Sequence, residues 1–246
     1  MDKPLTREDR DGAAILTLNR PDKLNALTVE MFMLLREHVD AIAQQTDKIG
    51  LVLLRGAGKC FCAGNDLAGI AAGATPPKPW YQGETIERLA SLPQPVITAV
   101  HSHCYTGGLE LALAGDIIVA SANAKFGDTH GKWALTPVWG MSQRLPRRVG
   151  AAKAKEMMFT SRTYSGAQAE AMGLANFCVA DDVFEAEVEK LTKEILGNSW
   201  FSHRGNKRLV DDTEGLPLKA GLAHEIYRTE GRGPDSQERI AAFMKK

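Results

Sequence analysis

The residues best suited to chemistry lie in His101–Asp116, which reads HSHCYTGGLELALAGD. An apolar strand-like run precedes this stretch, and a short apolar helix follows the pair Gly107 and Gly108. The first amides of a helix have no partner within the helix, and the helix dipole makes that end electropositive. The turn can therefore bind an oxyanion or a thioester oxygen. Glu110 follows within the first helical turn, close enough to exchange a proton with the molecule that carries this oxygen.

A second glycine-rich turn follows another strand-like run. Gly56–Leu67 reads GAGKCFCAGNDL and comes directly after IGLVLLR. Its amides near Gly64 and Asn65 are free to point outward, because glycine lets the backbone approach a ligand closely. Many α/β proteins use one such turn for packing alone. Two of them can point one amide each at the same oxygen, which favours a catalytic interpretation.

Strand and helix patterns alternate around these turns. Apolar runs of strand length predict strands over Ala13–Asn19, Ile49–Leu54 and Pro95–Val100. Thr28 can cap the helix that lies between the first two. The apolar residues of this helix recur at helical spacing and are Met31, Leu34, Leu35, Val39 and Ile42. From residue 151 onward the pattern is mostly helical, with three more helices from residue 200. The alternation predicts an α/β fold.

Composition narrows the class of protein. The chain has 246 residues, 44% hydrophobic and 24% charged, as in a globular enzyme with one large domain or one domain and a small appendage. Its formal net charge is zero, so we expect no nucleic-acid partner and no membrane partner. The charged N-terminus lacks an apolar signal segment, and no apolar run reaches the roughly 18 residues that span a bilayer. The cysteines lack zinc spacing, so we expect reduced core residues, no metal and a cytoplasmic location; they are Cys60, Cys62, Cys104 and Cys178.

Three further stretches complete a pattern that runs along nearly the whole chain. They are NRPDKLNAL (Asn19–Leu27), FGDTHGKWALTPVWGMSQRLPRRVG (Phe126–Gly150) and the closing GPDSQERIAAFMKK. With the two glycine turns, the chain resembles the enoyl-CoA hydratase/isomerase (crotonase) superfamily. The resemblance implies a ClpP/crotonase spiral of ββα units over residues 1–195 and a helical trimerisation region over residues 196–246. It also implies an acyl-CoA substrate, no cofactor beyond the CoA of that substrate, and a homotrimer or dimer of trimers.

The resemblance assigns roles to particular residues. It places the two oxyanion-binding amides on Asn65 and Gly107. It implies that residues of two segments line the CoA part of the substrate. They are Lys23, Leu24, Ala26, Lys59, Ala63, Gly64, Asp66 and Leu67. For Asp66 we also expect a structural role, as the cap of the short helix that follows.

The chain departs from the family's pattern at one chemically important position. Glu110 matches the first catalytic glutamate of the hydratases, but His130 stands where the second should be. Pro137 lies where the family has it, so the register is sound. A histidine with an ordinary pKa near 6.5 can act as acid or base at neutral pH, and Asp128 can orient its ring. The alternative is that His130 only lines the pocket and transfers no proton. Smaller departures are Ser102 and Thr106, where family members usually have glycine.

The predicted reaction is the addition of water to a 2-enoyl-CoA, with Glu110 and His130 as the catalytic pair. The missing second glutamate leaves other reactions open on the same scaffold: enoyl-CoA isomerisation, or acyl-CoA hydrolysis or decarboxylation. A non-catalytic acyl-CoA-binding protein is a third class. A serine–histidine hydrolase is disfavoured, because Ser102 and His103 are neighbours in an extended chain and point to opposite faces.

Overall fold

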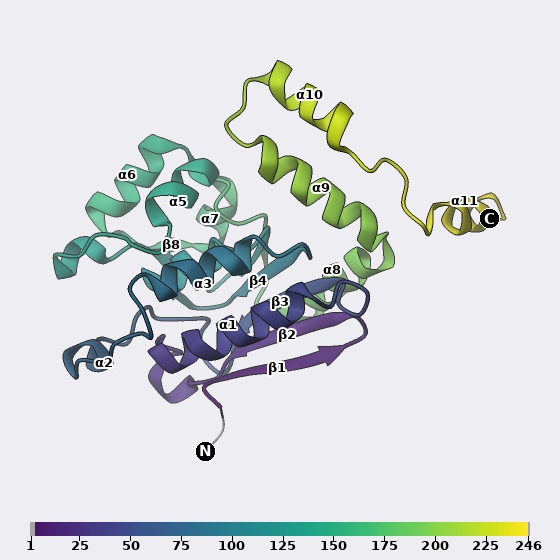
Figure 1. Cartoon of the computed structure of the whole chain (residues 1–246). Helices are drawn as coiled ribbons and strands as arrows, with labels where there is room; N and C mark the ends of the chain where they lie inside the picture. The colour runs from purple at the N-terminus through teal and green to yellow at the C-terminus, as the bar shows by residue number, and fades with distance from the viewer. Residues whose placement is uncertain (1–2, 246) are drawn as a thin grey trace.

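The central element of this computed structural model, which describes residues 3–245, is a six-stranded sheet (Figure 1). The first two strands pair antiparallel, and every other neighbouring pair is parallel. Parallel strands joined by helices confirm the expected α/β class. In sheet order the strands are β1 (Leu5–Arg10), β2 (Ala13–Leu18), β3 (Leu51–Gly56), β4 (Val96–Val100), β6 (Ile117–Ser121) and β9 (Phe177–Val179).

Helices cover both faces of this sheet, which is why its inner strands β2, β3 and β4 are almost continuously apolar, whereas the edge strand β1 is mostly polar. Helices α1 (Val29–Ala43) and α3 (Tyr81–Ala90) lie side by side on one face (Figure 1). Thr28 caps α1 as expected, with its hydroxyl accepting a hydrogen bond from the amide of Met31 at 3.2 Å. On the other face, α8 (Phe184–Gly197) packs its apolar side chains against the strands. The sheet is therefore rigid where its strands lead into the glycine turns.

A second, three-stranded sheet carries the segments of chemical interest. The helix that begins at the glycine pair, α4 (Gly107–Ala112), directly follows its first strand, and the 3-10 helix η2 (His130–Trp133) follows its second. The strands are β5 (His103–Tyr105), β7 (Lys125–Gly127) and β8 (Tyr164–Ser165). The remaining helices before α8 are η1 (Pro21–Lys23), α2 (Leu67–Ala71), α5 (Met141–Val149), α6 (Ala151–Thr160) and α7 (Gly166–Ala171).

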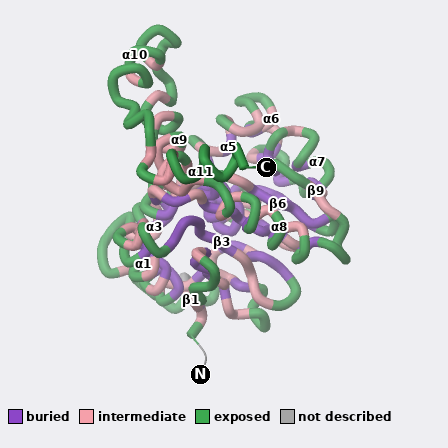
Figure 2. The backbone as a smooth tube through the Cα atoms, turned by 90° about the vertical axis from the view of Figure 1, so that its right-hand side faces the viewer, coloured by how far each residue is buried: buried purple, intermediate pink, exposed green. Residues whose placement is uncertain are grey.

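Three helices close the chain, as the sequence predicted: α9 (Trp200–Thr213), α10 (Leu218–Arg228) and α11 (Ser236–Met244). Helix α10 projects from the body and is mostly exposed (Figure 2). The expected boundary between residues 195 and 196 falls in the last turn of α8, and both this division and the trimer stay predictions. Large apolar side chains are exposed on these helices, namely Val210, Leu218, Leu222, Ile226, Tyr227, Ile240, Phe243 and Met244.

The cysteines lie where core residues were expected. Cys60, Cys62 and Cys104 are buried, Cys178 is half-buried, and all four are free thiols. Burial raises the pKa of Cys62 to about 12, so this thiol stays protonated and unreactive. In residues 3–245, no group of His, Cys, Asp and Glu side chains is arranged to hold a metal ion. None of the helices described has the length and apolar character needed to cross a membrane.

We predict that replacing Gly50 with alanine destabilises the protein. A Cβ atom there would lie 2.2 Å from Cε2 of Trp200, the first residue of α9. Because a rigid indole cannot move aside, we expect a loss of about 1–3 kcal/mol in the free energy of unfolding. The matched control is Gly205→Ala in α9, where a Cβ meets nothing within 4 Å. There we expect a gain of about 0.5–1 kcal/mol from helix propensity, both values measured by urea unfolding. Equal stability of Gly50→Ala and wild type would contradict this packing of α9.

Candidate active site

The N-terminus of α4 is packed so closely that only glycine fits. A Cβ atom on Gly107 would lie 2.6 Å from Cζ3 of Trp139, and one on Gly108 would lie 2.6 Å from the carbonyl oxygen of Cys62. This close approach brings the start of α4 against the first glycine turn. One turn further, the helix carries Glu110, which is only 1% exposed. The helix therefore presents a buried carboxyl group beside its own free amides.

The two predicted amides come together at one cavity. The amide nitrogen of Asn65 lies 3.4 Å from the Cβ position of Gly107, and both residues line a cavity of about 730 Å³. Leu27 donates to Gly64 at 2.8 Å and accepts from Asp66 at 2.9 Å, so the amide of Asn65 points to the opposite side of this turn. Within residues 3–245, no protein acceptor takes a hydrogen bond from the amide of Asn65 or of Gly107. Both are available to a ligand oxygen.

The segment before α1 holds the first glycine turn in place. Asn25 is fully buried, and its side-chain amide donates to the carbonyl oxygens of Ala57 at 2.9 Å and Cys60 at 2.7 Å. Arg20 forms an ion pair with Asp66 at 2.8 Å. Sequence reasoning missed Arg20 and Asn25, although both belong to the stretch that suggested the family. Their role is to position the turn.

The residues predicted to contact CoA divide into two groups. Three line the cavity, namely Ala63, Gly64 and Leu67. The others do not line it, namely Lys23, Leu24, Ala26, Lys59 and Asp66. The two lysines are exposed, on segments that meet where Gly58 contacts Pro21.

Asp66 has the structural role that was expected. Its Oδ1 accepts hydrogen bonds from the amides of Ala68 and Gly69, both at 3.1 Å, at the start of α2. The bond from Gly69, together with the Arg20 guanidinium, lowers the pKa of this carboxyl. The carboxylate of Asp66 is therefore used in hydrogen bonds and an ion pair within the protein.

Thr106 holds the second turn in a conformation that favours glycine. Its φ of 51° and ψ of −109° lie outside the usual regions for L-residues, which costs about 1–3 kcal/mol. The structure offsets this strain with hydrogen bonds. The amide of Thr106 donates to Gly127 at 2.9 Å, and its hydroxyl accepts from the amide of Thr129 at 3.0 Å. The departure from glycine thus ties the second turn to the segment that leads to His130.

Three ionisable side chains form a buried row beside the amides. Oε1 of Glu110 accepts hydrogen bonds from the amides of Trp139 at 2.9 Å and Met141 at 3.3 Å. Its Oε2 lies 3.7 Å from Nε2 of His130. On the far side of the ring, Nδ1 of His130 lies 2.6 Å from Oδ1 of Asp128. The structure therefore brings together Glu110 and His130, as the sequence predicted, with Asp128 behind them.

The surroundings shift the pKa values of both facing groups. Burial raises the pKa of Glu110, although the charge of His130 and the two amide hydrogen bonds oppose this. Burial by itself would lower the pKa of His130. The hydrogen bond and charge of Asp128, together with the charge of Glu110, outweigh burial, so the pKa of His130 is raised. Two facing acid and base groups that both have perturbed pKa values and line one cavity are typical of a site of proton transfer.

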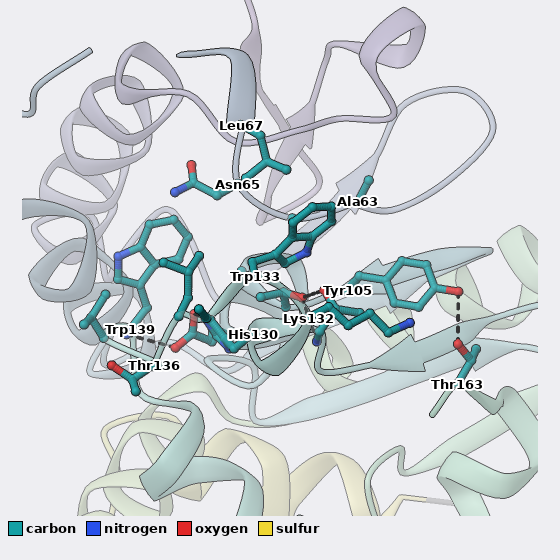
Figure 3. Close-up of a pocket in the computed structure, with 18 residues that line it drawn as sticks. Ala63, Asn65, Leu67, Tyr105, His130, Lys132, Trp133, Thr136, Trp139 and Thr163 are labelled. Atoms are coloured by element: carbon teal, nitrogen blue, oxygen red, sulfur yellow. Dashed lines mark hydrogen bonds and ion pairs between the residues drawn. The ribbon is translucent and has the colours of Figure 1, made fainter. Parts of the chain in front are cut away.

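Aromatic and apolar side chains form the other walls of the cavity. Figure 3 shows His130, Thr136 and Trp139 toward one end and Tyr105 with Thr163 toward the other. The ring of Trp139 packs edge-on against Phe32, with centroids 4.9 Å apart. Sequence reasoning missed Trp139, because nothing in its local pattern shows that it contacts Gly107. The cavity suits a largely apolar acyl group whose polar end meets the amides.

Comparison with known proteins identifies the class. The family described as enoyl-CoA hydratase/isomerase matches residues 8–244. The 1,2-epoxyphenylacetyl-CoA isomerase of Escherichia coli is 33% identical, covering 96% of this chain and 93% of its own. The probable peroxisomal enoyl-CoA hydratase 1 of Arabidopsis thaliana is 32% identical, covering 88% and 81%. The enoyl-CoA hydratase structure from Bacillus anthracis superposes with a TM-score of 0.89 at 28% identity, covering 98% and 96%.

The chain therefore belongs to the enoyl-CoA hydratase/isomerase family of enzymes. It has the crotonase fold, with a helical C-terminal region, as the sequence predicted. The family acts on acyl-CoA substrates.

We predict that Glu110→Gln stabilises the fold at alkaline pH. A carboxyl whose pKa is raised on folding loses stability as pH rises from its ordinary pKa of 4.5 through the raised pKa. Glutamine stays neutral and keeps an oxygen for the amides of Trp139 and Met141. In urea unfolding, we expect the variant's midpoint to exceed that of wild type at about pH 8, and by less at about pH 5. A matched control, Glu189→Gln at an exposed position on α8, should show no such gain. A lower midpoint for Glu110→Gln at about pH 8 would refute this.

Proposed function

We propose that this enzyme is a 2-enoyl-CoA hydratase that uses Glu110 and His130 as its acid–base pair. The observation that carries the proposal is the 3.7 Å approach of these two side chains within the cavity that the free amides line. A hydratase needs a base to activate water, an acid to protonate carbon, and donors for the thioester oxygen. The residues proposed for all three functions line one cavity, so a single acyl group bound there would meet them.

The amides of Asn65 and Gly107 would bind the thioester oxygen. As water attacks C3, the electrons of the C2–C3 double bond move toward the thioester, and its oxygen gains negative charge. Two amides aimed at this oxygen stabilise the enolate, and losing one such donor typically costs about 3–4 kcal/mol of barrier. The dipole of α4 adds to this stabilisation, because its positive end faces the same point.

Glu110 would act as the base and His130 as the acid. The carboxylate of Glu110 takes one proton from water while the oxygen bonds to C3. The imidazolium of His130 then gives the proton on Nε2 to C2 of the enolate. These steps leave a neutral imidazole beside a protonated carboxyl group. A proton returning from Glu110 to His130 across their contact restores the starting state, so one water is added overall.

We also propose that Ala63, Gly64 and Leu67 contact the pantetheine end of CoA, because they lie beside the amide of Asn65 in the cavity wall. The exposed Lys23 and Lys59 would meet the CoA phosphates outside the cavity, where a solvated cation can attract them.

The experiment is turnover of crotonyl-CoA and of a longer 2-enoyl-CoA, followed by loss of the enoyl-thioester absorbance and by product mass. We expect wild type to give a product heavier by one water. Glu110→Gln and His130→Ala should each lower kcat by about a hundredfold or more. The matched controls are Glu189→Gln and His224→Ala, outside the cavity lining, and should leave kcat unchanged.

Other outcomes would replace the hydratase. A product of unchanged mass would indicate an isomerase, the activity named for the Escherichia coli relative. Release of free CoA would indicate a hydrolase. Binding of CoA thioesters without any turnover would indicate a binding protein. Full activity of His130→Ala would reduce His130 to a residue of the cavity wall.

A further inference from the structure

We propose that Asp128 is a positioning residue that holds His130 as an imidazolium and directs its Nε2–H toward Glu110 and the substrate. This inference rests on the proposed hydratase reaction, because the protonation state of His130 decides whether His130 or Glu110 is the acid in that reaction. Its first test, however, observes the ring of His130 directly and needs no turnover.

Asp128 fixes the orientation of the His130 ring from the side opposite Glu110. Oδ1 of Asp128 lies 2.6 Å from Nδ1 of His130 and accepts the backbone amide of the same residue at 3.1 Å. One carboxyl oxygen thus binds both the ring and the main chain of His130. Asp128 itself is only 1% exposed, at the end of β7, so it cannot swing away into solvent. A carboxylate at Nδ1 requires the proton there, which turns Nε2 toward Glu110.

Charge balance in the row favours a cation at its centre. Asp128 and Glu110 are both buried, and a buried charge is unfavourable unless it is paired. Among residues 3–245, the only cationic group within ion-pair distance of either carboxyl is the ring of His130. A neutral imidazole would leave two buried acids without a counter-charge. An imidazolium pairs with both, with one nitrogen for each.

Within the part of the chain that the structure describes, Glu110 and Asp128 are the charged groups that act on this ring. From α4 it faces Glu110, and from its own loop it faces Asp128. Helix α6 also packs against η2, and the groups around Gly131 there are the uncharged backbone carbonyl of Met158 and hydroxyl of Ser161. Lys132 lines the cavity but is exposed. The protonation of His130 therefore depends on the two carboxyl groups. Of these, Asp128 is hydrogen-bonded to the ring at 2.6 Å, whereas Glu110 lies 3.7 Å away.

The deciding variant is Asp128→Asn, which keeps the size and an oxygen acceptor but removes the charge. If Asp128 only supports the loop, asparagine should replace it without consequence. If Asp128 holds the imidazolium, the pKa of His130 should fall by about one unit or more. Above that pKa the protonated fraction drops tenfold per pH unit. At alkaline pH, kcat should therefore fall about tenfold or more, while KM changes little.

The first measurement is a pH titration of the ring ¹⁵N shifts of His130 by NMR, with the signal assigned from its absence in His130→Gln. We expect wild-type His130 to titrate above the ordinary value of about 6.5, Asp128→Asn to titrate lower, and Asp128→Glu to lie nearer to wild type. Equal titration of wild type and Asp128→Asn would overturn the proposal. So would a neutral ring in wild type below about pH 6.5, an outcome that does not depend on whether Asp128→Asn folds.

The second measurement is the pH profile of kcat on crotonyl-CoA. The alkaline limb should move to lower pH in Asp128→Asn by the same amount as the NMR titration, and Asp128→Glu should restore it in part. The two proposals fail in different ways. A shifted titration without any turnover would keep the role of Asp128 and reject the hydratase. Turnover with unshifted titration and profile would keep the hydratase and reject the role of Asp128.

Discussion

The buried carboxyl of Glu110 is the feature on which the rest of the site depends. A carboxyl group that is 1% exposed has given up most of its hydration, so the protein must supply hydrogen bonds and charge in place of water. Two amides at the start of α5 and the ring of His130 supply them. The effect of burial on this carboxyl is larger than the opposing effect of these partners, so its pKa is raised. The proposed chemistry uses this shift, since a carboxylate with a raised pKa is a stronger base.

Each partner of Glu110 comes from a different part of the chain. The carboxyl lies on α4, which connects β5 of the small sheet to β6 of the large one. His130 follows β7, and the two amides come from the segment entering α5. Thr106, whose backbone is strained, connects the first two of these segments through its hydrogen bonds to Gly127 and Thr129. The site therefore forms only when both sheets are folded.

Much of the fold could be predicted from local pattern. Apolar runs predicted the parallel strands, Thr28 predicted the start of α1, and glycine-rich stretches predicted the two turns, because each signal is contained in a few neighbouring residues. The contacts that complete the site could not be predicted in this way. The hydrogen bonds of Asn25 and the packing of Trp139 against Gly107 join segments more than thirty residues apart. Their geometry depends on how the sheets meet.

The central claim is that one bound thioester oxygen meets both free amides while Glu110 and His130 face its C2 and C3 carbons. A crystal structure with acetoacetyl-CoA, which carries the thioester but no double bond to hydrate, tests this most directly. The account predicts the thioester oxygen within about 3 Å of the amide nitrogens of both Asn65 and Gly107. It also predicts that the first acyl carbons lie between the amides and the Glu110–His130 pair. A thioester oxygen bound away from either amide, or an acyl group on the far side of Trp139, would contradict it.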